Sequence, residues 1–435
     1  MARMMAKLRA GAALALLLGA GACSHPGPAA RDDRLSRELA AIAADPVHGM
    51  ASLSVLAVSG GKVSYQGQFG MRSMDAALPA EPETMYRIAS ISKLVTTLGV
   101  MRLVEQGKLD LDADVGAYLG FALRNPAHPD APVTLRMLLS HTSSLRDEGG
   151  YSWGPGTSLR QAMADNAGKW DARAPGSYFA YSNLNFGVVG TVMEAVSGER
   201  FDRLMSKLVL APLGLRGGYN VSEMPREQWR QVATLYRKRP PAGGPWNPQG
   251  PWFAQVDDFS VQAPAAPAGI GAYAPGTNGT VFSPTGGLRL SARDLGTLMA
   301  MMMEEGRHAG QPFLKPSTLA SMLSRQWRYN PAWPNGDTHH GLFSEWGLGV
   351  QHFEARAGRG ASLVEGGGFR ASGHLGEAYG LLSVFAFDRL RRDGMIVLIG
   401  GTASDPAATP GKYSALSRQE ELVLTALHRH LASSP

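Results

Sequence analysis

A serine and a lysine three residues apart are the side chains in this sequence best suited to covalent chemistry. Ser90 and Lys93 stand at the start of an apolar-periodic run, so a helix there would place both on one face. A serine hydroxyl is a poor nucleophile until a neighbouring base removes its proton, and a desolvated lysine one turn away can be that base. The pair predicts a nucleophilic serine, although alone it fits equally well a helix cap beside a solvated lysine.

The same spacing occurs at Ser59 and Lys62, which shows how easily it arises. These residues flank Gly60-Gly61 between two strand-like runs. Such a dipeptide predicts a tight hairpin turn, so this second pair is expected on the surface.

A second serine motif also needs weighing. Gly150-Tyr151-Ser152-Trp153-Gly154 matches Gly-x-Ser-x-Gly, the nucleophile elbow of α/β-hydrolases. That elbow requires a buried strand before the serine and a helix after it, and neither flank fits. Ser152 is expected in a loop, with Trp153 lining the cleft.

Two more motifs bring polar groups from distant parts of the chain. Tyr181 is the only tyrosine with an asparagine, Asn183, two residues later, and an apolar helix-like run follows. His374-Leu375-Gly376 leads directly into a long strand-like run, unlike the three other His-x-Gly matches. The simpler interpretation makes Tyr181 a half-buried aromatic and Asn183 a helix N-cap. The order and context of the three motifs together favour a catalytic site.

These motifs resemble the serine β-lactamase and penicillin-binding protein superfamily, whose first motif is Ser-x-x-Lys. Three more segments resemble its class C β-lactamase-like branch, which includes D-alanyl-D-alanine carboxypeptidases, D-aminopeptidases and family VIII esterases: Leu138 to Ser143, Pro175-Gly176 and Gly286-Gly287-Leu288. The resemblance implies a serine hydrolase that forms an acyl-enzyme on Ser90 and hydrolyses a small ester, amide or D-amino-acid peptide in the cell envelope. The alternatives are a β-lactamase proper and a catalytically silent penicillin-binding or cell-wall sensor protein.

The resemblance also implies a role for each residue of the first two motifs. Ser90 is the expected nucleophile, and Lys93 is the general base or the cation that holds a base. Tyr181 would relay a proton between Ser90 and the leaving group. Asn183 would orient Lys93 or bind a substrate amide.

The third motif would bind substrate. His374 stands where class C β-lactamases carry lysine, and it offers a weaker fixed positive charge near neutral pH, so efficient β-lactam hydrolysis is in doubt. Gly376 would let substrate backbone approach, and the N–H groups of Glu377 and Ser90 would form an oxyanion hole. The Glu377 carboxylate would disfavour anionic substrates or attract an amine, or else point to solvent.

The periodicity predicts an α+β fold of the α/β-sandwich type. Strand-like runs lie near both ends of the chain, at 53–69 and 379–399, with helix-like runs between them. This order predicts an antiparallel sheet built from both chain ends and flanked by helices, with an inserted, mainly helical domain. The clearest helix is expected over 88–106, with an apolar stripe of Leu94, Leu98, Met101 and Val104.

The expected domain division follows from this pattern. Residues 34–110 and 281–435 would form the sheet domain, and 111–280 the helical insertion. Within the insertion, 240–280 is rich in Pro, Gly and Ala. A loop of that length is expected to border the cleft, or to be a disordered excursion.

The N-terminus has the pattern of a targeting signal. Residues 1–22 combine a basic start with a short apolar run, and 23–33 form a tether. Cys23 is the only cysteine and follows small residues, as in a bacterial lipobox, although leucine is usual where Ala20 stands. The expectation is an exported protein, either a lipoprotein acylated on Cys23, in the outer membrane because Ser24 follows, or a soluble periplasmic protein.

Composition narrows the expected partners. Charged residues make up 18% and hydrophobic residues 44%, as in an ordinary globular protein, and the net charge of +6 includes a basic leader. No Lys/Arg run resembles a nucleic-acid footprint, so no nucleic-acid partner is expected. No histidine group has convincing metal-ligand spacing, so neither metal nor cofactor is expected. The expected partner is a small-molecule or peptidoglycan-derived substrate, with membrane contact only through a lipid on Cys23.

Overall fold

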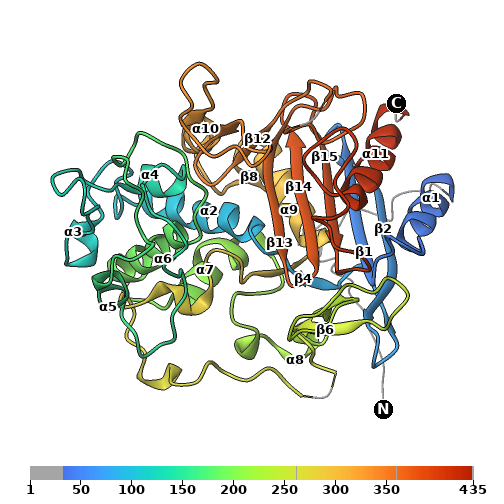
Figure 1. Ribbon diagram of the computed structural model, residues 1–435, viewed down its shortest axis with the longest axis horizontal. Helices are drawn as coiled ribbons and strands as arrows, with labels where there is room; N and C mark the ends of the chain where they lie inside the picture. The colour runs from blue at the N-terminus through green and yellow to red at the C-terminus, as the bar shows by residue number, and fades with distance from the viewer. Residues whose placement is uncertain (1–32, 261, 359, 434–435) are drawn as a thin grey trace, which may run out of the picture.

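The computed structural model describes residues 33–260, 262–358 and 360–433, and is built around one antiparallel sheet. Its nine strands run in the order β10-β11-β12-β13-β14-β15-β1-β2-β3. Strand β1 (Ser52–Ser59) pairs with β2 (Lys62–Ser73) on one side and with β15 (Asp393–Ile399) on the other. The sheet is therefore built from both chain ends, which confirms the α+β prediction (Figure 1). The other strands are β3 (Leu78–Pro79), β10 (Trp327–Arg328), β11 (Glu345–Trp346), β12 (Gln351–Phe353), β13 (Ala371–Ala378) and β14 (Leu381–Asp388).

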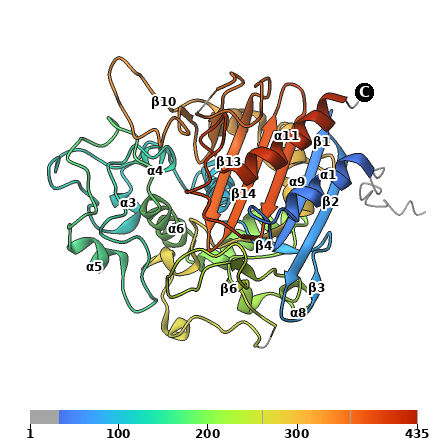
Figure 2. The same ribbon diagram turned by 45° about the vertical axis from the view of Figure 1, so that its right-hand side comes forward.

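Both faces of this sheet are buried, which explains why its central strands are largely apolar. Successive side chains of a strand point to opposite faces. In β1, Val55 and Ala57 pack into one hydrophobic cluster, whereas Leu56 and Val58 pack into another. Helices α1 (Asp33–Ala43) and α11 (Arg418–Ser433) cover the first face, and α9 (Ala292–Met303) and α2 (Ile91–Glu105) the second (Figure 2).

Helix α2 lies at the centre of the molecule and differs in two ways from the sequence expectation. It begins at Ile91 rather than at 88, because β4 (Met85–Arg87) pairs with β7 (Arg289–Ser291) and Ile88 N–H donates to the Leu288 carbonyl. The preceding chain is thus held extended up to the turn before the helix. The helix is also buried on almost every side rather than along one stripe, as expected where a helix contacts both a sheet and other helices.

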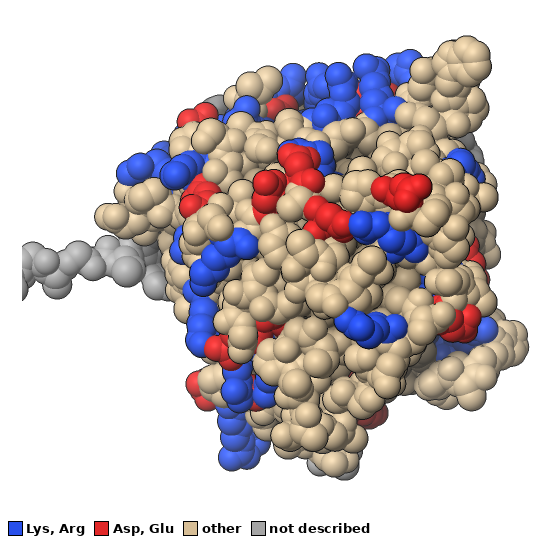
Figure 3. Space-filling view, turned by 90° about the vertical axis from the view of Figure 1, so that its left-hand side faces the viewer, with Lys and Arg blue, Asp and Glu red and all other residues tan. Residues whose placement is uncertain are grey.

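A mainly helical region lies beside the open end of the sheet, at the left of Figure 1. Its helix α6 (Leu184–Ser197) contacts both α2 and α4 (Leu135–Leu139). Helix α6 therefore packs against two helices that are distant from it in the sequence. The other helices of this region are α3 (Gly116–Leu119), α5 (Leu159–Ala164) and α7 (Phe201–Met205), whereas α8 (Arg226–Trp229) lies apart from this region, at the bottom of Figure 1. Ion pairs such as Arg136–Asp112 lie on this region, and acidic side chains lie among basic ones on the face in Figure 3.

The smaller elements complete the chain. The pair Ser59 and Lys62 flanks the β1–β2 turn, with Gly60 and Gly61 both at positive φ, as predicted for a hairpin. No helix in the described residues is long and apolar enough to cross a membrane. The remaining helices and strands are β5 (Leu235–Arg237), β6 (Phe253–Val256), β8 (Arg307–His308), β9 (Gln311–Pro312), α10 (Pro316–Leu323) and β16 (Gly401–Thr402).

Candidate active site

Ser90 occupies the N-cap position of α2, yet its side chain does not cap the helix. The preceding residue, Ala89, has a φ of 46°, a left-handed conformation that is unusual for any residue but glycine. Backbone strain of this kind persists where the surrounding structure enforces it, commonly at functional sites. The half-buried Ser90 hydroxyl is therefore free for contacts on the cleft side.

Lys93 is fully buried one turn into α2, and its ammonium nitrogen contacts three oxygen atoms. Nζ lies 2.9 Å from Ser90 Oγ, 2.8 Å from Asn183 Oδ1 and 3.0 Å from the Thr285 carbonyl oxygen. Burial lowers the pKa of Lys93 to about 7, although the negative charge of Asp147 acts in the opposite direction. The structure thus places beside Ser90 an amine that is partly neutral at physiological pH, as a general base requires.

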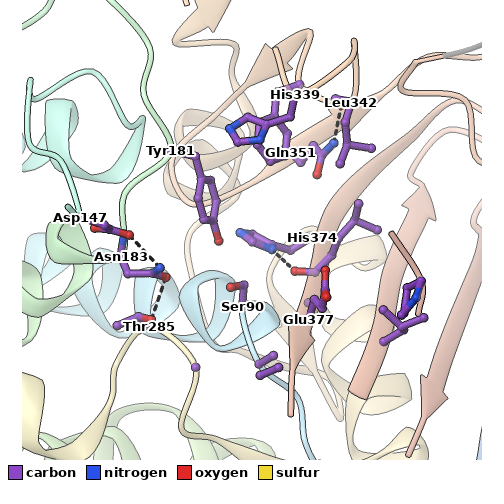
Figure 4. A pocket seen from close by; sticks show the side chains of 18 of the residues that line it. Ser90, Asp147, Tyr181, Asn183, Thr285, His339, Leu342, Gln351, His374 and Glu377 are labelled. Atoms are coloured by element: carbon purple, nitrogen blue, oxygen red, sulfur yellow. Dashed lines mark hydrogen bonds between the residues drawn. The ribbon is translucent and has the colours of Figure 1, made fainter. Parts of the chain in front are cut away.

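Tyr181 approaches Ser90 from the other side of the cleft (Figure 4). Burial raises the pKa of its phenol, while a hydrogen bond with Ser90 acts in the opposite direction. Lys93 Nζ lies 5.0 Å from the ring centroid, and the His141 ring stacks on the phenol at 4.4 Å. At neutral pH Tyr181 is accordingly a protonated phenol that can donate, whereas Lys93 is the group with basic character.

Asn183 is held between Lys93 and an aspartate. It stands at the N-cap position of α6, but its side chain makes no capping hydrogen bond. Its Nδ2 donates to Asp147 Oδ2 at 2.9 Å, and its Oδ1 accepts from Lys93 and from Thr285 Oγ1. The Asn183 side chain therefore contacts Lys93 instead of capping the helix.

His374 is buried on β13 and points toward Tyr181 and Ser90 (Figure 4). Its Nδ1 lies 2.6 Å from the Leu375 carbonyl oxygen, so Nδ1 carries the proton. Its Nε2 is buried without a hydrogen-bond partner among the described residues. Burial first, and then the charge of Lys93, lower the pKa of His374 to about 3, so it is a neutral acceptor at physiological pH.

Gly376 brings β13 against the start of α2. A Cβ at this position would lie 2.6 Å from the Ile88 carbonyl oxygen and 3.0 Å from Ser90 N. Strand β13 pairs with β12 only over residues 371–373, which leaves its edge without a strand partner, among the described residues, from His374 onward. A substrate backbone can reach Ser90 along that edge. The neighbouring Glu377 side chain is exposed in the wall of the cleft.

These residues line one cavity of about 1250 Å³. Ser90, Tyr181, Asn183, His374, Gly376 and Glu377 all face it, and Lys93 lies directly behind Ser90. Four carboxylates line it with a single arginine: Asp147, Glu148, Glu377, Glu420 and Arg87. In the described parts of the chain, no group of three His, Cys, Asp or Glu residues could hold a metal ion.

Several sequence expectations about the cleft need correction. Trp153 does not line it, because the Trp153 ring packs against the hydrophobic core, and Tyr151 and Ser152 line the cavity instead. Of the described residues in 240–280, only Thr280 lines the cavity, because β6 pairs with β5 and draws the preceding chain away. Cys23 and the leader lie outside the described residues.

Asp147, Thr285 and His141 are the site residues that motif analysis did not assign. His141 lies in a segment that resembled the superfamily, and Thr285 directly precedes another, so a signal was present in or beside both residues. Asp147 lies in the loop between α4 and α5, and no local pattern marks it. It becomes visible only when the fold brings that loop against the start of α6.

Comparisons with known proteins agree with this arrangement. A family model described as Beta-lactamase matches residues 37–419. Over 182 residues the chain is 34% identical to esterase EstB from Burkholderia gladioli, covering 38% of the chain and 46% of the esterase. It is 30% identical to penicillin-binding protein 4* from Bacillus subtilis strain 168, over 37% of the chain and 36% of that protein. The match thus spans less than half the length of either relative.

Solved structures share the fold at lower sequence identity. A D-amino acid amidase from Ochrobactrum anthropi SV3 superposes with a TM-score of 0.63 and 19% identity, covering 92% of this chain and 99% of the amidase. At that identity the likeness concerns the fold alone.

Proposed function

The chain belongs to the β-lactamase family, and from this membership we propose that it is a serine hydrolase that forms an acyl-enzyme on Ser90. The observation that carries the proposal is the contact of Lys93 Nζ with Ser90 Oγ at 2.9 Å in a cleft that Tyr181 and His374 complete. A nucleophile, a base of suitable pKa and a proton donor then occupy one cavity.

The residues supply each step of acyl transfer. Ser90 Oγ attacks the substrate carbonyl carbon while its proton passes to Lys93 Nζ. The carbonyl oxygen becomes an oxyanion, for which the N–H groups of Ser90 and Glu377 are the proposed donors. As the tetrahedral intermediate collapses, the Tyr181 phenol protonates the leaving group and regains a proton from Lys93. Water then attacks the acyl carbon and gives a proton to Lys93 Nζ, the bond between that carbon and Ser90 Oγ breaks, and Lys93 passes the proton to Ser90 Oγ.

The charge distribution favours an uncharged substrate. His374 is neutral where a lysine would bind a substrate carboxylate. Asp147, Glu148 and Glu377 line the cavity with one arginine, whereas burial raises the pKa of Glu420 to about 7, so Glu420 is only partly charged at neutral pH. An anionic β-lactam or a peptide C-terminus would be repelled, whereas an uncharged small ester or amide would not. The name of esterase EstB agrees with an ester substrate.

The proposed setting is the cell envelope. The pattern of residues 1–22 and the lone Cys23 support export, either as a lipoprotein or as a soluble periplasmic protein. A peptidoglycan-derived amide would be within reach there. Radiolabelled palmitate incorporation that depends on Cys23 would distinguish the lipoprotein from the soluble form.

The test is covalent labelling with a fluorophosphonate probe, followed by a substrate panel. Ser90→Ala should abolish labelling, and Ser59→Ala, the matched serine of the hairpin Ser-x-x-Lys, should label like the native protein. p-Nitrophenyl acetate should be turned over faster than nitrocefin or a D-alanyl-D-alanine peptide. Labelling that persists in Ser90→Ala would refute the proposal. Labelling without product release would instead indicate a penicillin-binding sensor.

A further inference from the structure

Asp147 makes four hydrogen bonds beside the catalytic groups, and the acyl-transfer steps above leave it without a role. Its half-buried carboxylate accepts four hydrogen bonds from the start of α6. Oδ1 accepts from Ser182 Oγ at 2.7 Å and from Leu184 N–H at 3.0 Å. Oδ2 accepts from Asn183 N–H and from Asn183 Nδ2, both at 2.9 Å. Asp147, which lies in a separate loop, thus caps α6 and accepts a hydrogen bond from the Asn183 side chain.

This contact fixes which way the Asn183 amide faces. A carboxylate can only accept hydrogen bonds, so the atom facing Asp147 must be the Nδ2 donor. Oδ1 then has to face the opposite side, where it accepts from Lys93 Nζ at 2.8 Å and from Thr285 Oγ1 at 3.0 Å. Figure 4 shows Asp147, Asn183 and Thr285 joined in this order.

The amide orientation in turn decides where Lys93 directs its lone pair. Neutral lysine has two N–H donors and one lone pair, and two of its three neighbours, Asn183 Oδ1 and the Thr285 carbonyl, can only accept. They take both N–H groups. The lone pair is left for the third neighbour, Ser90 Oγ, at 2.9 Å, whose proton it must remove.

We propose that Asp147 is a positioning residue that acts through Asn183 to aim the lone pair of Lys93 at Ser90. The inference rests on the proposed function, since it assumes that Lys93 is the base. Asp147 also contributes the negative charge that partly offsets the effect of burial on the pKa of Lys93. It thereby keeps Lys93 both oriented and able to accept a proton near neutral pH.

A double-mutant cycle separates this role from simple support of the fold. Asp147→Asn places an amide, which can donate, opposite Asn183 and should slow acylation of Ser90 by about 10- to 100-fold, less than the roughly 10²- to 10⁴-fold that a general base itself contributes. In an Asn183→Ala background the same change should cause a smaller loss than in the native protein, because only the effect of the Asp147 charge on Lys93 then remains. Asp130→Asn removes an equal charge from an exposed residue that does not line the cavity, and should leave the rate within about twofold of the native value. Losses that multiply in the double variant would overturn the proposal.

The pKa of Lys93 can be measured without catalytic turnover, so it tests the role of Asp147 separately from the proposed hydrolase function. NMR titration of labelled lysine, with the Lys93 signal assigned from Lys93→Arg, should show Lys93 titrating at lower pH in Asp147→Asn than in the native protein. Asp130→Asn should leave that titration in place, because Asp147 is the charge that acts on Lys93. An unchanged Lys93 titration in Asp147→Asn would overturn the role of Asp147. Absence of Ser90 labelling in the native protein would overturn the proposed function instead.

Discussion

Lys93 Nζ contacts Ser90 Oγ at 2.9 Å although Ser90 lies in a turn and Lys93 in a helix. Ser90 ends the turn that follows β4, whereas Lys93 is inside the first turn of α2. The helix begins directly after Ser90, which makes Ser90 its N-cap, whereas a helix beginning at 88 would have placed Ser90 within its first turn.

Replacing Lys93 by alanine should lower the rate of Ser90 acylation by about 10²- to 10⁴-fold, the usual contribution of a general base. Lys93→Arg should be as slow, because a guanidinium keeps the charge but does not give up its proton. Stopped-flow measurement of fluorophosphonate labelling would follow both. Lys62→Ala, the matched lysine of the hairpin, should label at the native rate. Near-native activity in Lys93→Arg would show that Lys93 acts only as a cation.

The acylation rate should rise with pH through about 7, because only the neutral amine can accept the Ser90 proton and the pKa of Lys93 is lowered to about 7. Above that pH the rate should level off, since burial keeps the Tyr181 phenol protonated well into the alkaline range. His374, with a pKa of about 3, should add no inflection between pH 5 and 8. A pH profile of kcat/KM for an uncharged ester checks this. An additional inflection of the profile near pH 6.5 that disappears in His374→Gln would show that His374 titrates in this range, and would contradict the prediction.

The sequence was sufficient to predict the sheet, its construction from both ends and the motifs that meet at Ser90. Strand period and helix period differ, so runs such as 53–69 and 183–196 are readable along the chain. The start of α2 was wrong by three residues because the pairing of β4 with β7 joins segments about two hundred residues apart. No local pattern contains that pairing.

The hydrogen bonds between Asp147 and Asn183 could not be predicted either, because they too join segments that no local pattern connects. They depend on a loop whose path is set by packing, with Arg146 N–H donating to the Lys169 carbonyl and Asp171 paired with the Arg146 guanidinium. Likewise, the lowered pKa values of Lys93 and His374 come from burial, which a motif does not specify.

Gly376→Ala should impair acylation by displacing β13 from the start of α2. The added Cβ would lie 2.4 Å from Ser383 Oγ and 2.6 Å from the Ile88 carbonyl oxygen, so one of the two elements must shift. A shift of β13 moves the Glu377 N–H away from Ser90, and loss of one oxyanion donor commonly costs about 10²- to 10³-fold in kcat. Gly154→Ala, where a Cβ would meet nothing within 4 Å, is the control. Native kcat in Gly376→Ala would exclude this oxyanion geometry.

Asp257 and Arg289 form a buried ion pair whose loss should destabilise the fold. Arg289 Nη2 and Nε donate to the two carboxylate oxygens at 2.6 and 3.0 Å, and the side chains are 7% and 4% exposed for Arg289 and Asp257. Asp257→Asn would leave a buried guanidinium without its countercharge, at a cost of about 3–5 kcal/mol in the free energy of unfolding. Asparagine also tolerates the φ of 60° at this position, so the change removes charge without adding strain.

The pH dependence of that loss provides the check. Burial would raise the pKa of Asp257, but the charge and hydrogen bonds of Arg289, together with Arg87, outweigh it and hold the pKa below its ordinary value. The pair therefore stabilises the fold above the unfolded-state pKa, about 3.9, and this stabilisation is lost as the pH falls through the lower folded-state value. In urea unfolding, the difference between native protein and Asp257→Asn should be full at pH 7 and shrink below about pH 4. Asp112→Asn, which breaks a pair whose aspartate is 65% exposed, should cost only about 0–1 kcal/mol. A cost for Asp257→Asn no larger than that of this surface control would show that the buried pair adds no net stability.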